Sequence, residues 1–258
     1  MEKQILENMN EAAEARSEIA QEYVEAAEAY LLGYGQSVVL REALLNPEDA
    51  ELIAKAQDYT KNYGAVNGNL ENVYLANYES TVLVSFVEGP IGKTLREGDS
   101  LKQLQDQVFG SKAVWNTGVM ASPSTGKQVV SMYYPIFDGD KPLGYVGAAI
   151  YAEELRNTLD QLQEDGGKDK DYMLLDATAN TYIFCPDEEK IGVAIEEESV
   201  LENIEFAKNS ETSSVFSEYK ENGKDEFYVY QYMPARNWVL VMLMERRTAF
   251  ASVTQMSA

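Results

Sequence analysis

The chain has 258 residues, of which 45% are apolar and 10% aromatic, so it can bury one large core or two smaller ones and is not disordered as a whole. Its 43 Asp and Glu outnumber 21 Lys and Arg, and the formal net charge of −22 disfavours binding to nucleic acid or to an anionic membrane surface. The sequence has no His and a single Cys, Cys185, which excludes a Ser-His-Asp or Cys-His nucleophile, an internal disulfide and a thiolate zinc cluster. Carboxylate catalysis and an oxygen-ligand metal site stay open, but no acidic cluster has the spacing of a Ca²⁺ loop, and no cofactor or metal is expected.

The residues before the first predicted strand are helical in pattern. A long helix is predicted over residues 2–45, because apolar residues recur at three- and four-residue steps between glutamates. The recurring residues are Ile5, Met9, Ala12, Ala15, Ile19, Tyr23, Ala26, Tyr30 and Tyr34. Such a helix would extend roughly 60 Å at about 1.5 Å per residue, and two glycines near its end allow a bend. The pair Asn46-Pro47 ends this helix and opens a short one over residues 47–63.

From residue 70 the pattern becomes that of strands, rich in Val, Ile, Tyr and Phe and separated by turn residues. The first set of predicted strands covers residues 70–76, 81–87, 113–120, 128–137 and 144–151, with helices over 98–109 and 152–164. A polar linker is predicted over residues 165–171. The second set covers residues 172–176, 181–184, 214–219, 224–233 and 238–244, with a helix over 200–207 and an exit helix over 245–258. Both sets run strand, strand, helix and three strands, which indicates two diverged copies of one unit and the α+β class.

Three groups of segments carry a family resemblance. The run TGKQVVS at residues 125–131, with residues 134–136 and 143–150, looks like the three closing strands of a membrane-distal module. Residues 175–183, followed by Pro-Asp-Glu, look like the opening hairpin of a membrane-proximal module, and residues 232–241 look like its last hairpin. In this order and spacing, over nearly the whole chain, they resemble the double Cache (dCache) family. These are extracytoplasmic sensor domains of bacterial chemoreceptors, histidine kinases and cyclic-dinucleotide enzymes.

The resemblance implies an architecture and a location. A long N-terminal helix and the following short helix would occupy residues 1–63 and lead to two PAS-like antiparallel-sheet modules, the membrane-distal one over 64–164 and the membrane-proximal one over 165–245. Residues 246–258 would be the exit helix toward the membrane. No apolar run approaches the ~18 residues that span a bilayer, and no signal-peptide pattern opens the sequence. The chain is therefore expected to be a soluble fragment of a protein that is membrane-anchored at full length, on the extracytoplasmic side of the bacterial cell membrane.

The resemblance also implies where a ligand would bind. In this family the distal module holds the ligand under a covering segment, here residues 89–115. Many amino-acid-binding members carry Arg-x-Trp-Tyr in that segment and an Asp late in the last strand that holds the ligand's ammonium group. Here Arg96 is followed by Glu-Gly-Asp, and Ala149 stands at the Asp position. An ammonium group needs a buried counter-charge, so the alanine argues against a standard α-amino acid as the ligand.

The cations, hydroxyls and aromatic rings that remain suit a small carboxylate or a flat polar molecule. The candidate ligand-binding residues are Trp115, Tyr133, Ser131, Tyr151, Arg96, Lys102, Tyr74 and Tyr78, with Lys112 as a further cation. Core packing is the alternative interpretation of the aromatic residues and an ordinary strand position that of the serine. Solvent exposure is the alternative for the three cations, of which at most one is expected to contact ligand. Asp176 and Asn180 are expected to shape a hairpin, and nothing indicates a ligand in the proximal module.

The function predicted is a sensor domain of a transmembrane chemoreceptor, not an enzyme, that binds a small molecule and signals through displacement of the long helix. A histidine kinase or diguanylate cyclase is the alternative output. A carboxylate-only hydrolase is the alternative from another class, although no pattern points to a pair of acids in one cleft. A homodimer through the alanine-rich stripe of the long helix is a further hypothesis, but the same stripe could instead lie on the sheets.

Overall fold

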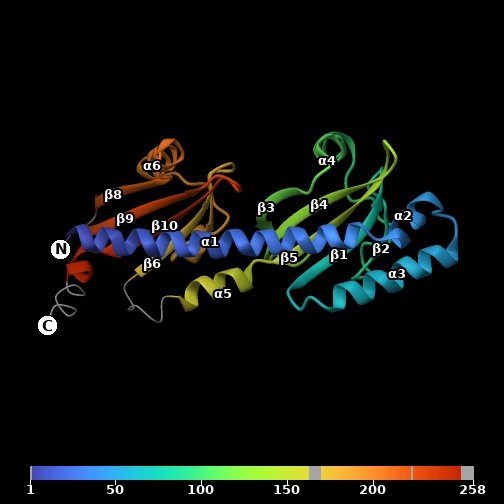
Figure 1. The fold of residues 1–258 in the computed structure, drawn as a ribbon, viewed down its shortest axis with the longest axis horizontal. Coiled ribbons are helices and arrows are strands. Elements are labelled where there is room, and N and C mark those ends of the chain that lie inside the picture. The colour runs from blue at the N-terminus through green and yellow to red at the C-terminus, as the bar shows by residue number, and fades with distance from the viewer. Residues whose placement is uncertain (1, 163–169, 222, 251–258) are drawn as a thin grey trace. The chain divides into compact units, whose positions relative to one another are not determined.

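The computed structural model describes residues 2–162, 170–221 and 223–250. The chain forms two compact units, which we call the first sheet unit (Val24–Ala152) and the second sheet unit (Met1–Tyr23 with Glu153–Ala258). Helix α1 (Glu2–Gly35) contributes residues to both units (Figure 1). No helix among the described residues combines the length and the apolar character needed to cross a membrane.

The predicted helix over residues 2–45 is wrong near its end. It is divided into α1 and α2 (Val38–Leu45), with Ser37 in an extended conformation before α2. A Cβ atom on Gly35 would lie 2.7 Å from Cδ1 of Tyr134 and 2.8 Å from Cγ2 of Val146, so close packing on a sheet requires glycine at the end of α1. The next helix, α3 (Ala50–Ala65), begins later than predicted, because the side chain of Asp49 caps it by accepting amide hydrogen bonds.

The predicted apolar stripe of the long helix is also partly wrong. Ala15 and Ala26 of that stripe are exposed. Ile5, Met9 and Tyr34 of the stripe are buried, and the other buried apolar positions of α1 are Ala13, Ala20, Val24, Ala27 and Leu31. An alanine-rich helix offers two neighbouring seams of small residues, and the seam that includes Val24 and Leu31 buries more apolar surface.

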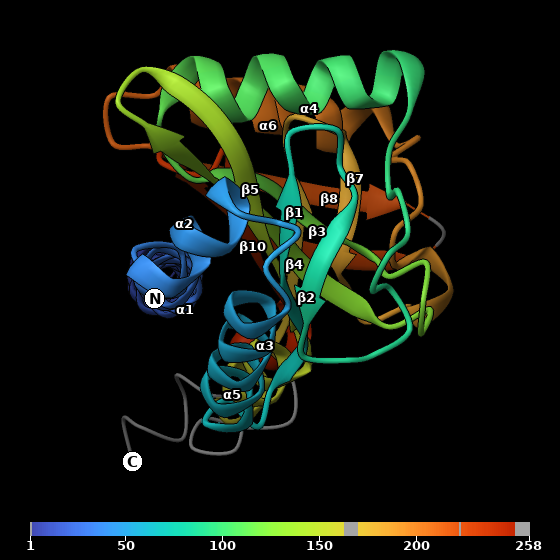
Figure 2. The same ribbon diagram turned by 90° about the vertical axis from the view of Figure 1, so that its right-hand side faces the viewer.

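The first sheet unit contains an antiparallel sheet of five strands in the order β2-β1-β5-β4-β3. Its elements are β1 (Leu70–Asn77), β2 (Val82–Ser85), α4 (Gly98–Ser111), β3 (Trp115–Ala121), β4 (Gln128–Asp138) and β5 (Lys141–Tyr151). Figure 2 shows α4 on one side of this sheet and the helices α2 and α3 on the other. Leu104 and Val108 of α4 are fully buried against Tyr133 and Tyr145 of the sheet.

The second sheet unit has a sheet of the same topology, in the order β7-β6-β10-β9-β8. Its elements are α5 (Glu153–Gln161), β6 (Lys170–Asp176), β7 (Thr181–Phe184), the short 3-10 helix η1 (Glu188–Lys190), α6 (Glu198–Asn209), β8 (Ser214–Glu221), β9 (Lys224–Met233) and β10 (Trp238–Glu245). Residues 246–250 are helical. Most of the predicted linker and the exit helix beyond residue 250 lie outside the described residues.

The two sheet units share local hydrogen bonds as well as strand order. Val82 donates its N–H to the carbonyl of Lys93 and accepts from Gly92, and Tyr182 does the same with Val193 and Gly192. The turns before these strands carry Ser80 and Asn180, which both have left-handed backbone conformations, with φ of 70° and 52°. The repeated order of strand, strand, helix and three strands, and the α+β class, are confirmed.

Candidate functional site

One row of paired residues crosses the face of the first sheet that α4 covers. From the outer strand β2 to the outer strand β3, the row is Ser85, Tyr74, Gly147, Tyr133 and Trp115. Paired residues project from the same face of a sheet, so the three aromatic side chains share this face. A Cβ atom on Gly147 would lie 2.4 Å from Cζ and Oη of Tyr74. The ring of Tyr74 therefore occupies the space above the middle strand, and only glycine at position 147 leaves room for it.

Arg96 is the cation of this cluster. It lies between β2 and α4, is half-buried, and donates from Nη2 to the hydroxyl of Tyr133 at 2.9 Å. Its guanidinium carbon lies 5.2 Å from the ring centre of Tyr133 and 5.9 Å from that of Trp115. Among the described residues, no carboxylate forms a salt bridge with Arg96, and its other side-chain bond is a long one of 3.4 Å to Ser100. A guanidinium group held by aromatic faces, with donors unused, is suited to bind a carboxylate.

Two further tyrosines, Tyr145 and Tyr74, lie near the guanidinium group. The ring of Tyr145 lies 5.8 Å from that of Tyr133 and 6.2 Å from that of Tyr74, and its hydroxyl shares a hydrogen bond with Ser80. Burial raises the pKa of Tyr145 to about 12 and the pKa of Tyr74 well above its usual range, while the charge of Arg96 acts in the opposite direction on both. These phenols are therefore neutral at physiological pH, and the formal charge that acts on them comes from Arg96.

The neighbouring row of the same face contains Asn72, Ala149 and Ser131. Ala149 is partly exposed and offers a methyl group to this face. Ser131 donates from its hydroxyl to that of Tyr133 at 3.3 Å. This part of the face therefore presents a hydroxyl and an apolar surface, without the carboxylate that the family resemblance led us to look for at position 149.

Five of the predicted residues are brought together here, namely Arg96, Trp115, Tyr133, Ser131 and Tyr74. Lys102 is not, because its side chain is 71% exposed and forms an ion pair with Asp106 one turn along α4. Lys112 pairs with Asp140 at 3.2 Å, away from the row of aromatic residues.

Two predicted tyrosines lie apart from the row. Tyr78 packs on Phe109 of α4 with ring centres 5.1 Å apart. Tyr151 is opposite Val129 at the far end of β5, with Nζ of Lys127 5.1 Å from its ring centre. Tyr145 and Gly147 were not among the residues predicted from the sequence. The period-two alternation of β5 places both on the face of Ala149, and that signal could have identified them.

The corresponding face of the second sheet is packed with aliphatic side chains together with the buried tyrosines Tyr182 and Tyr230. Tyr145 pairs with Ala76 opposite Val82, and Val239 pairs with Leu175 opposite Tyr182, so the two middle strands can be matched. Where β5 has Gly147, β10 has Val241, which is fully buried. The core under α6 includes Val239, Val241, Ile204 and Ala207. The side chain of Val241 therefore stands at the position where Gly147 leaves space for the ring of Tyr74 in the first sheet.

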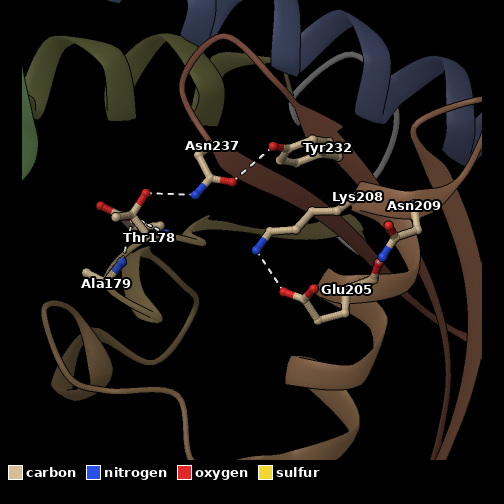
Figure 3. Close-up of polar contacts among 8 residues, drawn as sticks. Thr178, Ala179, Glu205, Lys208, Asn209, Tyr232 and Asn237 are labelled. Atoms are coloured by element: carbon tan, nitrogen blue, oxygen red, sulfur yellow. Dashed lines mark hydrogen bonds and ion pairs between the residues drawn. The ribbon is translucent and has the colours of Figure 1, made fainter.

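Polar groups at the edge of this second core satisfy one another. Asn237 donates from Nδ2 to Thr178 at 2.7 Å and accepts from the hydroxyl of Tyr232 at 3.0 Å, while Lys208 pairs with Glu205 at 2.7 Å (Figure 3). Asp176 shapes the hairpin as predicted, because its side chain accepts the amide hydrogens of Thr178 and Ala179. Asn180 contributes the left-handed residue of that turn.

A second polar group lies where α6 begins. Burial alone would raise the pKa of Glu197, but hydrogen bonds from Lys190 and Tyr182 lower it to about 2. Lys190 and Lys208 are thus paired with carboxylates, whereas no described carboxylate forms a salt bridge with Arg96. Among residues 2–162, 170–221 and 223–250, no group of three or more His, Cys, Asp or Glu is arranged to hold a metal ion.

Comparison with known proteins places the chain in a family. The family model of the double Cache domain, described as Cache domain, matches residues 1–253, so the chain belongs to the Cache domain family. No curated protein matches the sequence significantly.

Solved sensor domains share the fold. The sensory domain of the Campylobacter jejuni chemoreceptor Tlp3 with isoleucine bound has 15% identity and a TM-score of 0.69, covering 96% of this chain and 95% of that one. The sensor domain of the V. cholerae histidine kinase DctB has 11% identity and a TM-score of 0.72, covering 95% and 98%. The ligand-binding domain of the Pseudomonas fluorescens chemoreceptor CtaA with L-isoleucine has 17% identity and a TM-score of 0.67, covering 97% and 96%. At these identities the likeness shows the fold.

Proposed function

We propose that this chain is the ligand-binding domain of a transmembrane receptor and that it detects a small carboxylate held by Arg96 between the first sheet and α4. The observation that carries the proposal is the guanidinium group of Arg96, which lies over two aromatic rings and forms no salt bridge with a carboxylate in the described part of the chain. A partly buried cation without a counter-charge is unfavourable by itself, and a bound anion would remove that cost.

Each residue of the cluster has a role in this proposal. Arg96 binds the carboxylate through two parallel N–H groups, as guanidinium groups commonly do. Trp115 and Tyr74 provide aromatic walls. The hydroxyl of Tyr133, which accepts hydrogen bonds from Arg96 and Ser131, donates to an oxygen atom of the ligand. Ala149 contacts the carbon chain of the ligand, since it is partly exposed on the same face.

The ligand has a carboxylate without an α-ammonium group. Two of the similar structures contain isoleucine, and those receptors must balance an ammonium charge. In this chain the formal charge acting on the buried phenols is positive, and Ala149 provides no carboxylate. An ammonium group placed here would be desolvated beside Arg96 without a partner.

The Cache domain family and the fold shared with solved sensor domains support a receptor context. We assign the first sheet unit to the membrane-distal module and the second to the membrane-proximal module, on the extracytoplasmic side of a bacterial membrane. Ligand binding shifts α1, which contributes residues to both units, and the signal passes to a cytoplasmic chemotaxis output. A histidine kinase is the second candidate output, because the sensor domain of DctB has the same fold. Pairing of two copies along α1 is part of the proposal for the full-length receptor.

The test uses ligands that differ by the ammonium group alone. Calorimetric titration of the purified chain with propionate and with L-alanine should give at least about fivefold tighter binding of propionate, because an unpaired ammonium costs roughly 1–3 kcal/mol. Pyruvate and succinate extend the panel. Arg96→Leu should abolish the binding, whereas Lys102→Leu, which removes the exposed cation of α4, should leave it unchanged. Tighter binding of L-alanine, or a loss caused by Lys102→Leu rather than Arg96→Leu, would overturn the proposal.

A further inference from the structure

Residues Trp115 and Asn116 of β3 connect the two faces of the first sheet. Trp115 lies in the aromatic row, with its ring centre 5.4 Å from that of Tyr133. Successive side chains of a strand project to opposite faces, so Asn116 projects away from α4. There its Nδ2 atom donates a hydrogen bond of 3.0 Å to Oε1 of Glu28 in α1. Adjacent residues of one strand thus contact the candidate ligand site and the long helix.

The strand that carries this pair is only partly fixed in the sheet. β3 is an outer strand, with hydrogen bonds to β4 on one side. Its register shifts between Asn116 and Val119, where Gly118 has a φ of 81°. The amide oxygen of Asn116 accepts the N–H of Gly118 at 2.8 Å, so the same side chain ties the irregular part of the strand to α1. An outer strand with a bulge can shift without disrupting the inner strands.

The helix segment that receives this bond is well anchored in the same unit. Val24, Ala27 and Leu31 of α1 are buried around Glu28. A displacement of Asn116 is therefore passed to a packed helix rather than to a loose side chain.

We infer that the hydrogen bond between Asn116 and Glu28 couples the state of the Arg96 site to helix α1. The inference rests on the proposed function for the identity of the ligand. Its test uses substitutions alone and needs no ligand. When Arg96 turns toward a carboxylate, its contacts with the rings of Trp115 and Tyr133 change, β3 shifts, and Asn116 carries the shift to Glu28. Asn116 is a positioning residue in this account and does not touch the ligand.

The second sheet unit has a comparable bond. The hydroxyl of Ser214, the first residue of β8, donates to Oδ1 of Asn10 in α1 at 2.7 Å. β8 is the outer strand that corresponds to β3 in the order of the second sheet. In each unit, then, the outer strand after the covering helix is bonded to α1. Ser214→Ala is accordingly a matched control, because it breaks the bond of the other unit.

The test measures amide hydrogen exchange in a double-mutant cycle of Trp115→Ala and Asn116→Ala in the full chain. Trp115→Ala should speed exchange of the amides of residues 24–31 by at least about fivefold, the lower end of coupling between sites. In the Asn116→Ala background the same change should have less than about a twofold effect. Ser214→Ala should leave the effect of Trp115→Ala unchanged. Arg96→Gln provides a second, milder perturbation of the site.

Two controls distinguish coupling from a purely structural role of the bond between Asn116 and Glu28: a conservative variant of Glu28, and hydrogen exchange in β5 as a reference. Glu28→Gln keeps an oxygen acceptor and should preserve the coupling, whereas Glu28→Leu should abolish it. Equal acceleration in α1 and in β5, or acceleration that persists without Asn116, would overturn the inference. So would an absence of any effect of Trp115→Ala and Arg96→Gln on α1. Propionate titration of Asn116→Ala tests the proposed function separately, since binding should persist there.

Discussion

The two sheet units have one topology and one set of turn hydrogen bonds, yet their middle strands differ where the covering helix lies over them. Strand β5 places Gly147 and Ala149 on that face, while β10 places Val241 and Leu243 at the matched positions. The valine is fully buried among apolar neighbours, whereas the glycine is overlain by the ring of Tyr74. At this position the same fold therefore buries a valine in one unit and leaves space for a tyrosine ring in the other, according to the size of one side chain.

The largest expected effect comes from a substitution at Val241, in the core of the second sheet unit. Val241→Ala should destabilise the chain by about 2–3 kcal/mol, because the removed methyl groups leave a cavity under α6. Chemical denaturation measures the change. Propionate binding should stay as in the wild type, and a change in affinity would show that the second core takes part in the site.

The reverse change adds a side chain at Gly147, the position of the first sheet that corresponds to Val241. Gly147→Ala should cost about 1–3 kcal/mol, because its Cβ would lie 2.4 Å from Tyr74 and force that ring to move. Tyr74→Leu should relieve most of this cost in the double mutant, as a double-mutant cycle in denaturant would show. Additive effects of the two substitutions would mean that the ring and the glycine do not compete for the same space.

Arg16 of the second sheet unit is a buried arginine that can be compared with Arg96 of the first. It lies on α1 in the second sheet unit, is 4% exposed, and its Nε atom has no hydrogen-bond partner among the described residues. Burial lowers the pKa of Arg16, with Tyr172 and Asp160 acting in the opposite direction. Arg16→Met should therefore leave the free energy of unfolding unchanged or raise it by about 1 kcal/mol, without loss of propionate binding. A large loss of stability would indicate that the charge of Arg16 is better compensated than its contacts indicate.

The smallest effect concerns Glu197 of the second unit. Its folded-state pKa of about 2 lies below the unfolded value near 4.5, so its ion pair with Lys190 stabilises the fold above pH 4.5, and this stability is lost as pH falls toward 2. The pair is partly exposed, with 37% of the Glu197 side chain accessible, so the contribution should not exceed about 1 kcal/mol. Acid denaturation of Lys190→Met should show a flatter loss between these pH values, and an unchanged profile would contradict the assignment.

Parts of the site could be read from residue patterns. The family resemblance implied a ligand site in the first module, and residue chemistry then gave Arg96, Trp115, Tyr133, Ser131 and Tyr74 as candidates, which the structure brings together. Lys102 could have been set aside, since Asp106 follows four residues later and such pairs form on the exposed face of a helix. The division of the long helix and its true buried seam could not be predicted as readily, because both depend on which residues of the sheet meet α1.

The sequence by itself determined the order of elements, the repeated organisation and the candidate cation and aromatic residues, because hydrophobic periodicity and residue chemistry are local properties. Only the tertiary structure decided that Gly147 lies between Tyr74 and Tyr133, and that Asn116 reaches Glu28 across 88 positions of the chain. Strand pairing and register arise from contacts between distant segments, whose free energies depend on the packing of a whole face. For this reason the chemistry of the site was visible in the sequence, whereas its arrangement was not.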